Sequence, residues 1–553
     1  MNEETNPLKL NKYLYIDRTP TWLVRSVYCF GIFSWLLVAY GFWRAMGVDP
    51  FYEWVVAPII GLFTAYHLMS FGINLFYRQF DKDRHIRLVK KFWKNSDEAS
   101  VDIFLPICGE DLEVLNNTWE YVSQIDYQNK KVYVLDDSKE DCDKHKFMAE
   151  SFGFNYIERP NKGEMKKAGN LKYTFERTNG EFIAIFDADF APHPDFLKEM
   201  LPYASDPKVG IVQSPQYFQT SQISYKKSPL AYAAAYQEEI FYRVMQVARD
   251  HFDAAICCGS NAVYRRRAVE DIGGPRQVDA SEDSRTGFAL LNKGWVTRYL
   301  PVLLAAGICP DNTYAYFHQQ HRWCRGRSSL VLSKEFLYSR VSIIQKICNV
   351  SGFLSFLSRP LMILLSFHLF WTLIFYSSYI SFMNSLIFFP YIIFSLFLFP
   401  LIHLIKFKKE VLFVSMVQLY ASAHALLGVF FGRSVAWIPT NAKHTTISAA
   451  FRQTIKAVAV YVILYLSLIA LSVRGQVVYL FDYDYYVIQF WMFWNIVLSA
   501  FLLWKMYRAI EEKQQKQMVN GKISRAAFGA WQFKTAGLYT AFSVFVFWFF
   551  AFW

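Results

Sequence analysis

The feature that most limits the fold of this chain is a set of long apolar runs confined to its two ends. Residues 24–43 and 54–77 form two such runs, and others follow residue 345. Runs of about 20 apolar residues can cross a bilayer as helices, because a helix satisfies its own backbone N–H and C=O groups. Residues 79–345 read instead like a soluble protein. The sequence therefore predicts an α-helical membrane protein with a large inserted domain.

The distribution of basic residues predicts the orientation of this membrane protein. The loop between the first two runs has no Lys or Arg, whereas residues 77–94 are strongly basic. The positive-inside rule then places the N-terminus and the inserted domain in the cytosol. The net charge of +12 comes mostly from residues that flank apolar runs, so we expect a lipid bilayer and no nucleic acid as partner. Eight cysteines without metal-binding spacing are expected to be reduced thiols.

The C-terminal region is predicted to hold five further spans. These are residues 361–376, 386–405, 454–473, 487–507 and 535–553. The run at 411–432 also contains Ser415, Gln418, Ser422 and His424, and we expect it to lie at the cytosolic interface. Seven spans would leave the C-terminus outside. The predicted division is a transmembrane pair (1–78), a cytosolic domain (79–345) and a transmembrane channel region (346–553).

The inserted domain alternates short apolar runs with helical patterns. The runs are residues 101–107, 131–137, 154–160, 181–189 and 209–215. Such alternation favours a mostly parallel, doubly wound sheet with helices between the strands. Ligands of such sheets bind beyond the carboxyl ends of the strands, so the functional site is expected there.

The run at 182–186 ends in Asp187-Ala188-Asp189. Strand pleating sends both carboxylates to the same side, where they repel each other unless a cation lies between them. A divalent metal that bridges to a diphosphate would explain the pair. A lone motif of this kind is more often an acidic turn, so its neighbours matter.

Three other polar motifs accompany this pair. Asp136-Asp137 follow another predicted strand, and Asp283 lies on a polar loop that opens a helical pattern. The segment 318–326, HQQHRWCRG, brings together Gln319, Arg322 and Trp323. Each motif alone has a plain structural reading, as an acidic turn or a basic-aromatic helix. All four in this order indicate a catalytic site.

With these motifs the chain resembles the membrane-integrated, processive, inverting glycosyltransferases typified by bacterial cellulose synthase, with hyaluronan synthase a more distant relative. The resemblance covers about residues 101–443. It extends to KAGN at 167–170, VQSPQYF at 212–218, FYRVMQVARD at 241–250 and CCGSNAVYRR at 257–266. The resemblance implies a GT-A-type domain with a mostly parallel, Rossmann-like sheet.

The resemblance also implies roles for individual residues. Asp283 would be the general base, and Asp187 and Asp189 would hold Mg²⁺ or Mn²⁺. The UDP-sugar would be bound by Glu110, Asp136, Asp137, Lys167, Asp187, Arg322, Thr440 and Lys443. The acceptor and the entrance of a polymer channel would be lined by Cys258, Gly259, Ser260, Gln319 and Trp323.

Some positions depart from the family pattern. Residues 433–450 resemble a gating loop, but Pro439 replaces Val and Lys443 lies one position later than usual. A plain basic loop is the alternative there. Cys108 stands where relatives often carry an aromatic residue, and Ser281 replaces Thr. No segment resembling a cyclic-di-GMP-binding module follows the spans, so we expect no such control.

The expected function is polymerisation of UDP-glucose into a β-linked glucan that crosses the plasma (inner) membrane. A 1,4 linkage is the first choice, with 1,3, 1,2 or mixed linkage also open. Synthesis of another polysaccharide such as hyaluronan, transfer to a lipid acceptor, and a channel without catalysis are the alternatives. Accessory subunits or a homo-oligomer are possible partners.

Overall fold

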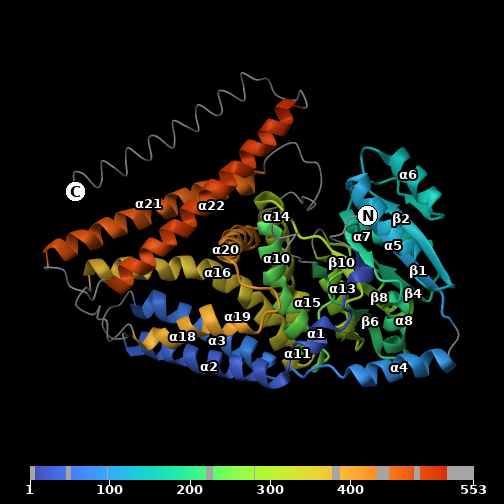
Figure 1. Ribbon diagram of the computed structural model, residues 1–553, viewed down its shortest axis with the longest axis horizontal. Coiled ribbons are helices and arrows are strands. Elements are labelled where there is room, and N and C mark those ends of the chain that lie inside the picture. The colour runs from blue at the N-terminus through green and yellow to red at the C-terminus, as the bar shows by residue number, and fades with distance from the viewer. Residues whose placement is uncertain are drawn as a thin grey trace.

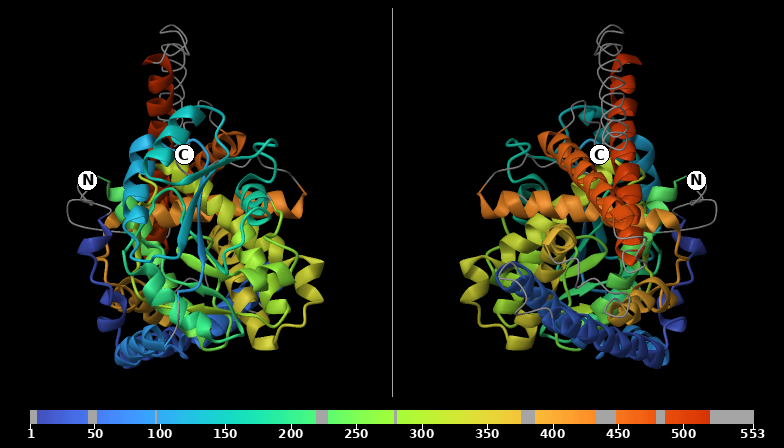
Figure 2. Two further views of the ribbon diagram at one scale, coloured as in Figure 1. Left: turned by 90° about the vertical axis from the view of Figure 1, so that its right-hand side faces the viewer. Right: turned by 90° about the vertical axis from the view of Figure 1, so that its left-hand side faces the viewer.

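The computed structural model consists of a sheet-containing domain and a bundle of long helices (Figure 1). In the two side views, helix α22 (Tyr486–Val519, red) extends beyond the other coloured elements (Figure 2). The described residues are 6–44, 52–95, 98–218, 228–278, 281–375, 386–432, 448–478 and 486–519.

A seven-stranded sheet forms the centre of the domain, in the order β3-β2-β1-β4-β8-β6-β9. Its strands are β1 (Val101–Ile107), β2 (Lys130–Asp136), β3 (Asn155–Glu158), β4 (Phe182–Ile185), β6 (Val209–Gln213), β8 (Ala262–Arg265) and β9 (Val296–Tyr299). All pairs are parallel except those that β8 makes with β4 and β6. The prediction of a mostly parallel sheet is confirmed, and each of the five predicted runs contains a strand.

Strand β8 was not predicted. It inserts antiparallel between β4 and β6, although its residues follow β6 by almost 50 positions. Three short strands form a second sheet in the order β5-β10-β7, namely β5 (Phe190–Pro192), β10 (Ala305–Gly307) and β7 (Tyr217–Phe218). Because β5 begins directly after Asp189, this small sheet fixes the C-terminal end of the turn Asp187-Ala188-Asp189, called the DxD turn below.

Helices connect the strands as predicted. They include α5 (Leu112–Ser123), α6 (Cys142–Ser151), α7 (Lys166–Phe175), α8 (Phe196–Met200), α12 (Arg266–Asp271), α13 (Glu282–Asn292) and α14 (Thr313–Val331). The core contains β1 and β4 side chains together with Trp119 of α5 and Phe196 of α8, which are fully buried. Burial of side chains of this size contributes about 1.5–3 kcal/mol each, so the core holds the strand ends in fixed positions.

Four helices of the described residues are long and apolar enough to cross a membrane. They are α2 (Thr21–Arg44), Glu53–Asn74 containing α3 (Ala57–Asn74), Ile343–Leu365 within α16 (Ile343–Phe375), and α20 (Lys409–Phe430). The first two match the predicted N-terminal spans. Helix α20 covers the run predicted to be interfacial, and by length and composition it too could span a bilayer.

The other predicted spans differ from the structure in their bounds. Helix α16 starts well before the predicted run at 361–376, since it continues through Pro360. The run at 386–405 is helical only over Leu386–Leu401, which is shorter than a full span. Helices α21 (Ala449–Val478) and α22 (Tyr486–Val519) contain the runs at 454–473 and 487–507. The run at 535–553 lies outside the described residues.

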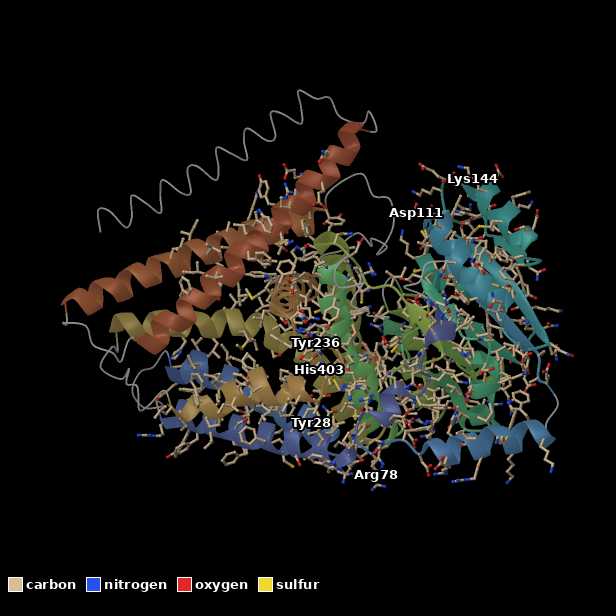
Figure 3. All side chains as sticks on the ribbon, in the orientation of Figure 1. Tyr28, Arg78, Asp111, Lys144, Tyr236 and His403 are labelled. Atoms are coloured by element: carbon tan, nitrogen blue, oxygen red, sulfur yellow. The ribbon has the colours of Figure 1, made fainter. Side chains whose placement is uncertain are left out.

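Buried hydrogen bonds and a stacked pair of rings connect the sheet-containing domain to the region of the long helices. Glu239, in α10 (Pro229–Ile240), accepts backbone hydrogen bonds from Leu404 (2.7 Å) and Ile405 (2.9 Å) and one from Arg243 Nε (2.8 Å). The ring of Tyr236 stacks on His403 with 3.9 Å between centroids (Figure 3). These hydrogen bonds hold α10 and residues 404–405 in a fixed relative position, because loss of a partner would leave the buried Glu239 charge uncompensated.

Candidate active site

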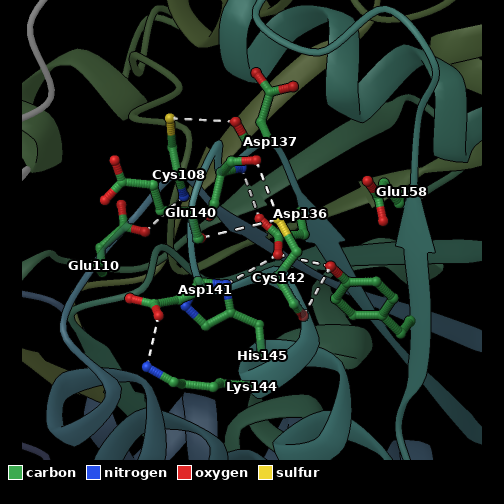
Figure 4. Close-up of polar contacts among 12 residues, drawn as sticks. Cys108, Glu110, Asp136, Asp137, Glu140, Asp141, Cys142, Lys144, His145 and Glu158 are labelled. Carbon is green, nitrogen blue, oxygen red and sulfur yellow. Dashed lines mark hydrogen bonds and ion pairs between the residues drawn. The ribbon is translucent and has the colours of Figure 1, made fainter.

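The end of β2 carries two buried carboxylates (Figure 4). Asp136 is fully buried and accepts hydrogen bonds from Ser138 N–H (2.7 Å) and Tyr156 O–H (2.7 Å), and its Oδ2 lies 3.0 Å from His145 Nδ1. Burial raises the pKa of Asp136, but these hydrogen bonds, led by that of His145, outweigh it and lower the pKa. Asp136 therefore stays ionised and ties β2, α6 and β3 together.

Asp137 is held by a buried arginine. Arg159 Nε and Nη2 each donate to one carboxylate oxygen at 2.9 Å, and the Gly163 N–H donates at 3.0 Å. The Cys108 thiol lies 3.8 Å from the Asp137 carbonyl oxygen. Burial raises the pKa of this thiol to about 12, so it is neutral. The predicted nucleotide-binding carboxylates thus also have structural partners from their own chain.

Loss of Arg159 is expected to destabilise the protein strongly. Arg159 and Asp137 are 2% and 5% exposed. Arg159→Ala would leave a buried carboxylate uncompensated, at a cost of about 3–5 kcal/mol. Lys144→Ala is the control, since Lys144 pairs with Asp141 at the surface, where such pairs contribute about 1 kcal/mol or less. Thermal unfolding of both variants in detergent measures the difference, and equal stability would contradict the structural role of Arg159.

The DxD turn at the end of β4 meets a lysine from α7. Lys167 Nζ donates to Asp187 Oδ1 at 2.5 Å and to the Gly259 carbonyl at 3.3 Å, and it lies 3.8 Å from Glu282 Oε1. Burial alone would lower the pKa of Lys167, but the carboxylates of Asp187 and Glu282 outweigh it and raise the pKa. One cation therefore joins three elements of the predicted site.

Asp189 has no such cation within hydrogen-bonding distance among the described residues. Desolvation, followed by the charge of Asp187, raises the pKa of Asp189 to about 7. Desolvation also raises the pKa of Glu110, which accepts a 2.6 Å hydrogen bond from the Cys108 N–H. Within the described part of the chain, no three His, Cys, Asp or Glu side chains are grouped as a metal cage. A metal held here would need further ligands from a substrate or water.

Asp283 lies in the first turn of α13, next to Glu282, whose Oε1 lies 3.8 Å from Lys167 Nζ. Its Oδ1 accepts a hydrogen bond from the Ser284 N–H at 2.7 Å. Desolvation, followed by the charge of Glu282, raises the pKa of Asp283 to about 7. A largely apolar cavity of about 30 Å³ adjoins it, lined by Phe104, Leu171, Ile185 and Tyr264 among others. Asp283 can therefore take up or release a proton near neutral pH.

The loop at 258–260 links Asp283 to the DxD turn. Gly259 has φ +78°, and a methyl group there would lie 2.8 Å from Asp283 Cβ. Ser260 Oγ accepts a hydrogen bond from the Asp187 N–H at 2.9 Å. Cys258 is held through its carbonyl by Gln216 Nε2 (3.0 Å). Two of the predicted channel-entrance residues thus lie against the site, Gly259 beside the Asp283 side chain and Ser260 at the Asp187 backbone.

Helix α14 brings the last predicted residues to the same centre. Gln319, Arg322 and Trp323 are half-buried and share one face, because their spacing is i, i+3, i+4. Burial lowers the pKa of Arg322 to about 10, and the charges of Glu282, Asp187 and Asp189 oppose that shift. Thr440 and Lys443 lie outside the described residues.

Sequence reasoning missed several residues that shape this centre. Arg159, His145 and Tyr156 hold the two carboxylates of β2, and Glu282 acts on Lys167, Asp283 and Arg322. Glu282 adjoins Asp283 in the sequence and could have been considered. Arg159 carried only a weak signal, namely a charge directly after a predicted strand.

Comparison with known proteins identifies this domain. Residues 103–326 match the family model described as glycosyltransferase like family 2. The matched range contains most of β1, the DxD turn, Asp283 and Arg322. These residues form a family 2 glycosyltransferase domain. Its mostly parallel sheet is the GT-A-like fold that the sequence predicted.

Relatives of the family 2 domain include two bacterial cellulose synthases. The chain is 34% identical over 278 residues to cellulose synthase 1 of Komagataeibacter xylinus, covering 49% of this chain and 18% of the relative. It is 31% identical over 327 residues to the UDP-forming cellulose synthase catalytic subunit of Pseudomonas fluorescens, covering 57% and 43%. The chain thus spans less than half the length of these curated relatives.

A solved structure similar to this chain is a mannosyltransferase from Pyrobaculum calidifontis in complex with GDP-Man and Mn²⁺. It has a TM-score of 0.47 and 17% sequence identity, and the alignment covers 68% of this chain and 100% of that one.

Proposed function

We propose that this protein is a processive, inverting glycosyltransferase that uses a UDP-sugar, with UDP-glucose as first choice, to extend a β-linked polysaccharide. The observation that carries the proposal is that Lys167 contacts Asp187 of the DxD turn and also Gly259, which packs against Asp283, the carboxyl group with a raised pKa. A base close to a diphosphate-binding centre suits attack of an acceptor hydroxyl on a nucleotide-activated sugar. The similarity to UDP-forming cellulose synthase subunits supports UDP-glucose.

The proposed reaction is a single displacement. The acceptor hydroxyl attacks the anomeric carbon while Asp283 takes the hydroxyl proton, and the new glycosidic C–O bond forms as the bond to UDP breaks. UDP leaves with the electron pair of that bond, and the configuration changes from α to β. Lys167 and Arg322 neutralise the charge that develops on the diphosphate. Trp323 offers an aromatic face for the terminal acceptor sugar.

A divalent metal fits the DxD turn. Desolvation, followed by the charge of Asp187, raises the pKa of Asp189, and a cation between the two carboxylates would stabilise both in their ionised form. Asp187 and Asp189 would hold Mg²⁺ or Mn²⁺, which supplies positive charge to the diphosphate when bound. Glu110, Asp136 and Asp137 remain proposed UDP contacts, with Thr440 and Lys443 as further ones.

The long helices suggest that the polymer leaves through the membrane. Four helices of the described residues can span a bilayer, and polar sugars need a protein-lined path through lipid. We therefore place the protein in the plasma (inner) membrane as a multi-pass protein with the family 2 domain in the cytosol. The domain division at residues 78 and 345 belongs to this proposal, as do the 1,4 linkage and any accessory subunits or homo-oligomer.

Incorporation of UDP-[³H]glucose by the purified, reconstituted protein tests the function. A polymer cut by one class of linkage-specific β-glucanase would support the proposal and name the linkage. Polymer from another UDP-sugar alone, for example the donors of hyaluronan, would overturn UDP-glucose. Label that partitions into organic solvent would instead indicate a lipid acceptor and overturn the proposal of a polysaccharide synthase.

Metal removal is expected to stop sugar transfer. EDTA should reduce incorporation to background, and added Mg²⁺ or Mn²⁺ should restore it, because the diphosphate then regains its counter-charge. Asp189→Asn should lower the rate at least about 100-fold and weaken Mn²⁺ binding, which can be followed by electron paramagnetic resonance. Full activity in EDTA would exclude metal dependence.

A further inference from the structure

Two arginines form a cationic pair beyond Asp283, on the side of the long helices. Arg249 lies in α11 (Gln246–Asp250), and Arg327 lies in α14. A methyl group placed on Gly352 of α16 would lie 3.5 Å from Arg249 Nη2 and 3.7 Å from Arg327 Nε. Both guanidinium groups therefore converge on the same residue of α16.

This pair has little compensation from the protein. Arg249 donates to Ser351 Oγ at 3.3 Å and Arg327 to Asn349 Oδ1 at 3.2 Å, and both acceptors are neutral. Arg249 is 2% exposed, and its Nε has no hydrogen-bond partner in the described residues. No ion pair joins either arginine to a carboxylate in that part of the chain. Burial, followed by the charge of Arg249, lowers the pKa of Arg327 to about 10.

The position of the pair connects it to the acceptor side of the site. Arg327 follows Trp323 by four residues, so it lies on the same face of α14 about 6 Å further along the helix. Gln246, one turn before Arg249, accepts from the Ile256 N–H (2.9 Å) and donates to the Ile256 carbonyl (2.7 Å). This bond holds α11 against the loop that contains Cys258 and Gly259. An acceptor stacked on Trp323 would extend its next sugar toward the two arginines.

Two like charges that form no ion pair with a carboxylate of the described residues are costly, since each desolvated ion costs several kcal/mol, and the more distant charge of Asp283 compensates Arg327 only in part. A bound anion would remove that cost, and guanidinium groups bind carboxylates through paired N–H donors. We propose that Arg249 and Arg327 bind the carboxylate of an acidic sugar in the acceptor chain, one ring behind the growing end. This inference rests on the proposed function and specifies its polymer, which would contain an acidic sugar in addition to glucose rather than glucose alone. A processive site suits a charge that recurs along a polymer.

Acceptor binding, measured apart from transfer, tests this inference. The probes are a tetrasaccharide of 4-linked glucuronic acid and cellotetraose, titrated calorimetrically into the full-length protein in detergent with UDP present. We expect the acidic probe to bind at least about tenfold more tightly at low salt, with an advantage that salt reduces. Asp283→Asn should retain this preference, so a failure of catalysis and a failure of the arginine site are distinguishable.

Arg327→Met should abolish the preference for the acidic probe, whereas Arg327→Lys should retain part of it. Arg276→Met is the matched control, because Arg276 has its own carboxylate partner in Glu335 (2.7 Å) and should leave binding unchanged. Thermal unfolding should show Arg327→Met at least as stable as the wild type, since a like-charge pair is relieved. Equal binding of both probes, or an unchanged preference in Arg327→Met, would overturn the inference. If incorporation of UDP-[³H]glucose depended on Arg327 but the labelled product partitioned into organic solvent, the inference would also be overturned. The arginines would then bind the phosphate of a lipid acceptor.

Discussion

Asp283→Asn is expected to reduce sugar transfer about 1,000-fold, within the range that removal of a general base produces. The amide has nearly the same shape but cannot take the proton of the acceptor hydroxyl. Among the described residues, no hydrogen bond or ion pair joins Asp283 to a proposed nucleotide-binding residue, so UDP binding should remain. The measurement is the initial rate of polymer formation together with UDP binding by calorimetry.

The same residue sets the expected pH dependence. Because desolvation raises the pKa of Asp283 to about 7, the carboxylate is protonated below that pH and cannot act as a base. The value of kcat/KM at saturating metal should therefore fall about tenfold per pH unit below pH 7 and level off above it. Asp271→Asn serves as control, since Asp271 accepts a surface hydrogen bond from Trp295 (2.9 Å) remote from the site. Substantial transfer by Asp283→Asn would remove Asp283 from the catalytic role.

The sequence predicted the parts of this protein that depend on local patterns. The apolar strands end in polar residues, and the parallel arrangement then brings the ends of β1, β2 and β4 to one edge of the sheet. The position of β8 could not be predicted, because an antiparallel insertion between β4 and β6 depends on pairing across distant segments. The sequence analysis grouped Gln319, Arg322 and Trp323 without giving a geometry, and their i, i+3, i+4 spacing on α14 places them on one helix face.

The partners of the site residues were harder to predict than the residues themselves. Asp136 and Asp137 look alike in the sequence, yet one is bound by Ser138 and Tyr156 and the other by Arg159. These pairings join segments that are distant along the chain and have no periodic signature. The bounds of α16 were missed for a related reason. Its first turns pack against α14 and α20 and can therefore hold polar residues that would be unfavourable in lipid.

Gly259→Ala is the second substitution expected to have a large effect. Gly259 has φ +78°, and an added Cβ would lie 2.8 Å from Asp283 Cβ and 2.9 Å from its Oδ2. Either the loop or Asp283 must move, and a displacement of about 1 Å in a catalytic group can cost about 100-fold in rate. We expect kcat to fall by about that factor. The Lys167 contact with the Gly259 carbonyl, and with it the position of the DxD turn, would also be disturbed.

Backbone strain must be separated from this steric effect, and Gly273 offers the matched control. It has φ +80°, but an added Cβ there would meet no atom within 4 Å. Gly273→Ala therefore carries the left-handed strain of about 1–2 kcal/mol without a clash. Its thermal stability should fall by this strain alone, and therefore less than that of Gly259→Ala, while its transfer rate should match the wild type. If Gly259→Ala also kept the wild-type transfer rate, the close contact with Asp283 would not be what positions the base. If only Gly259→Ala lost transfer activity, the absence of a methyl group at residue 259 would be what keeps Asp283 in place for proton transfer.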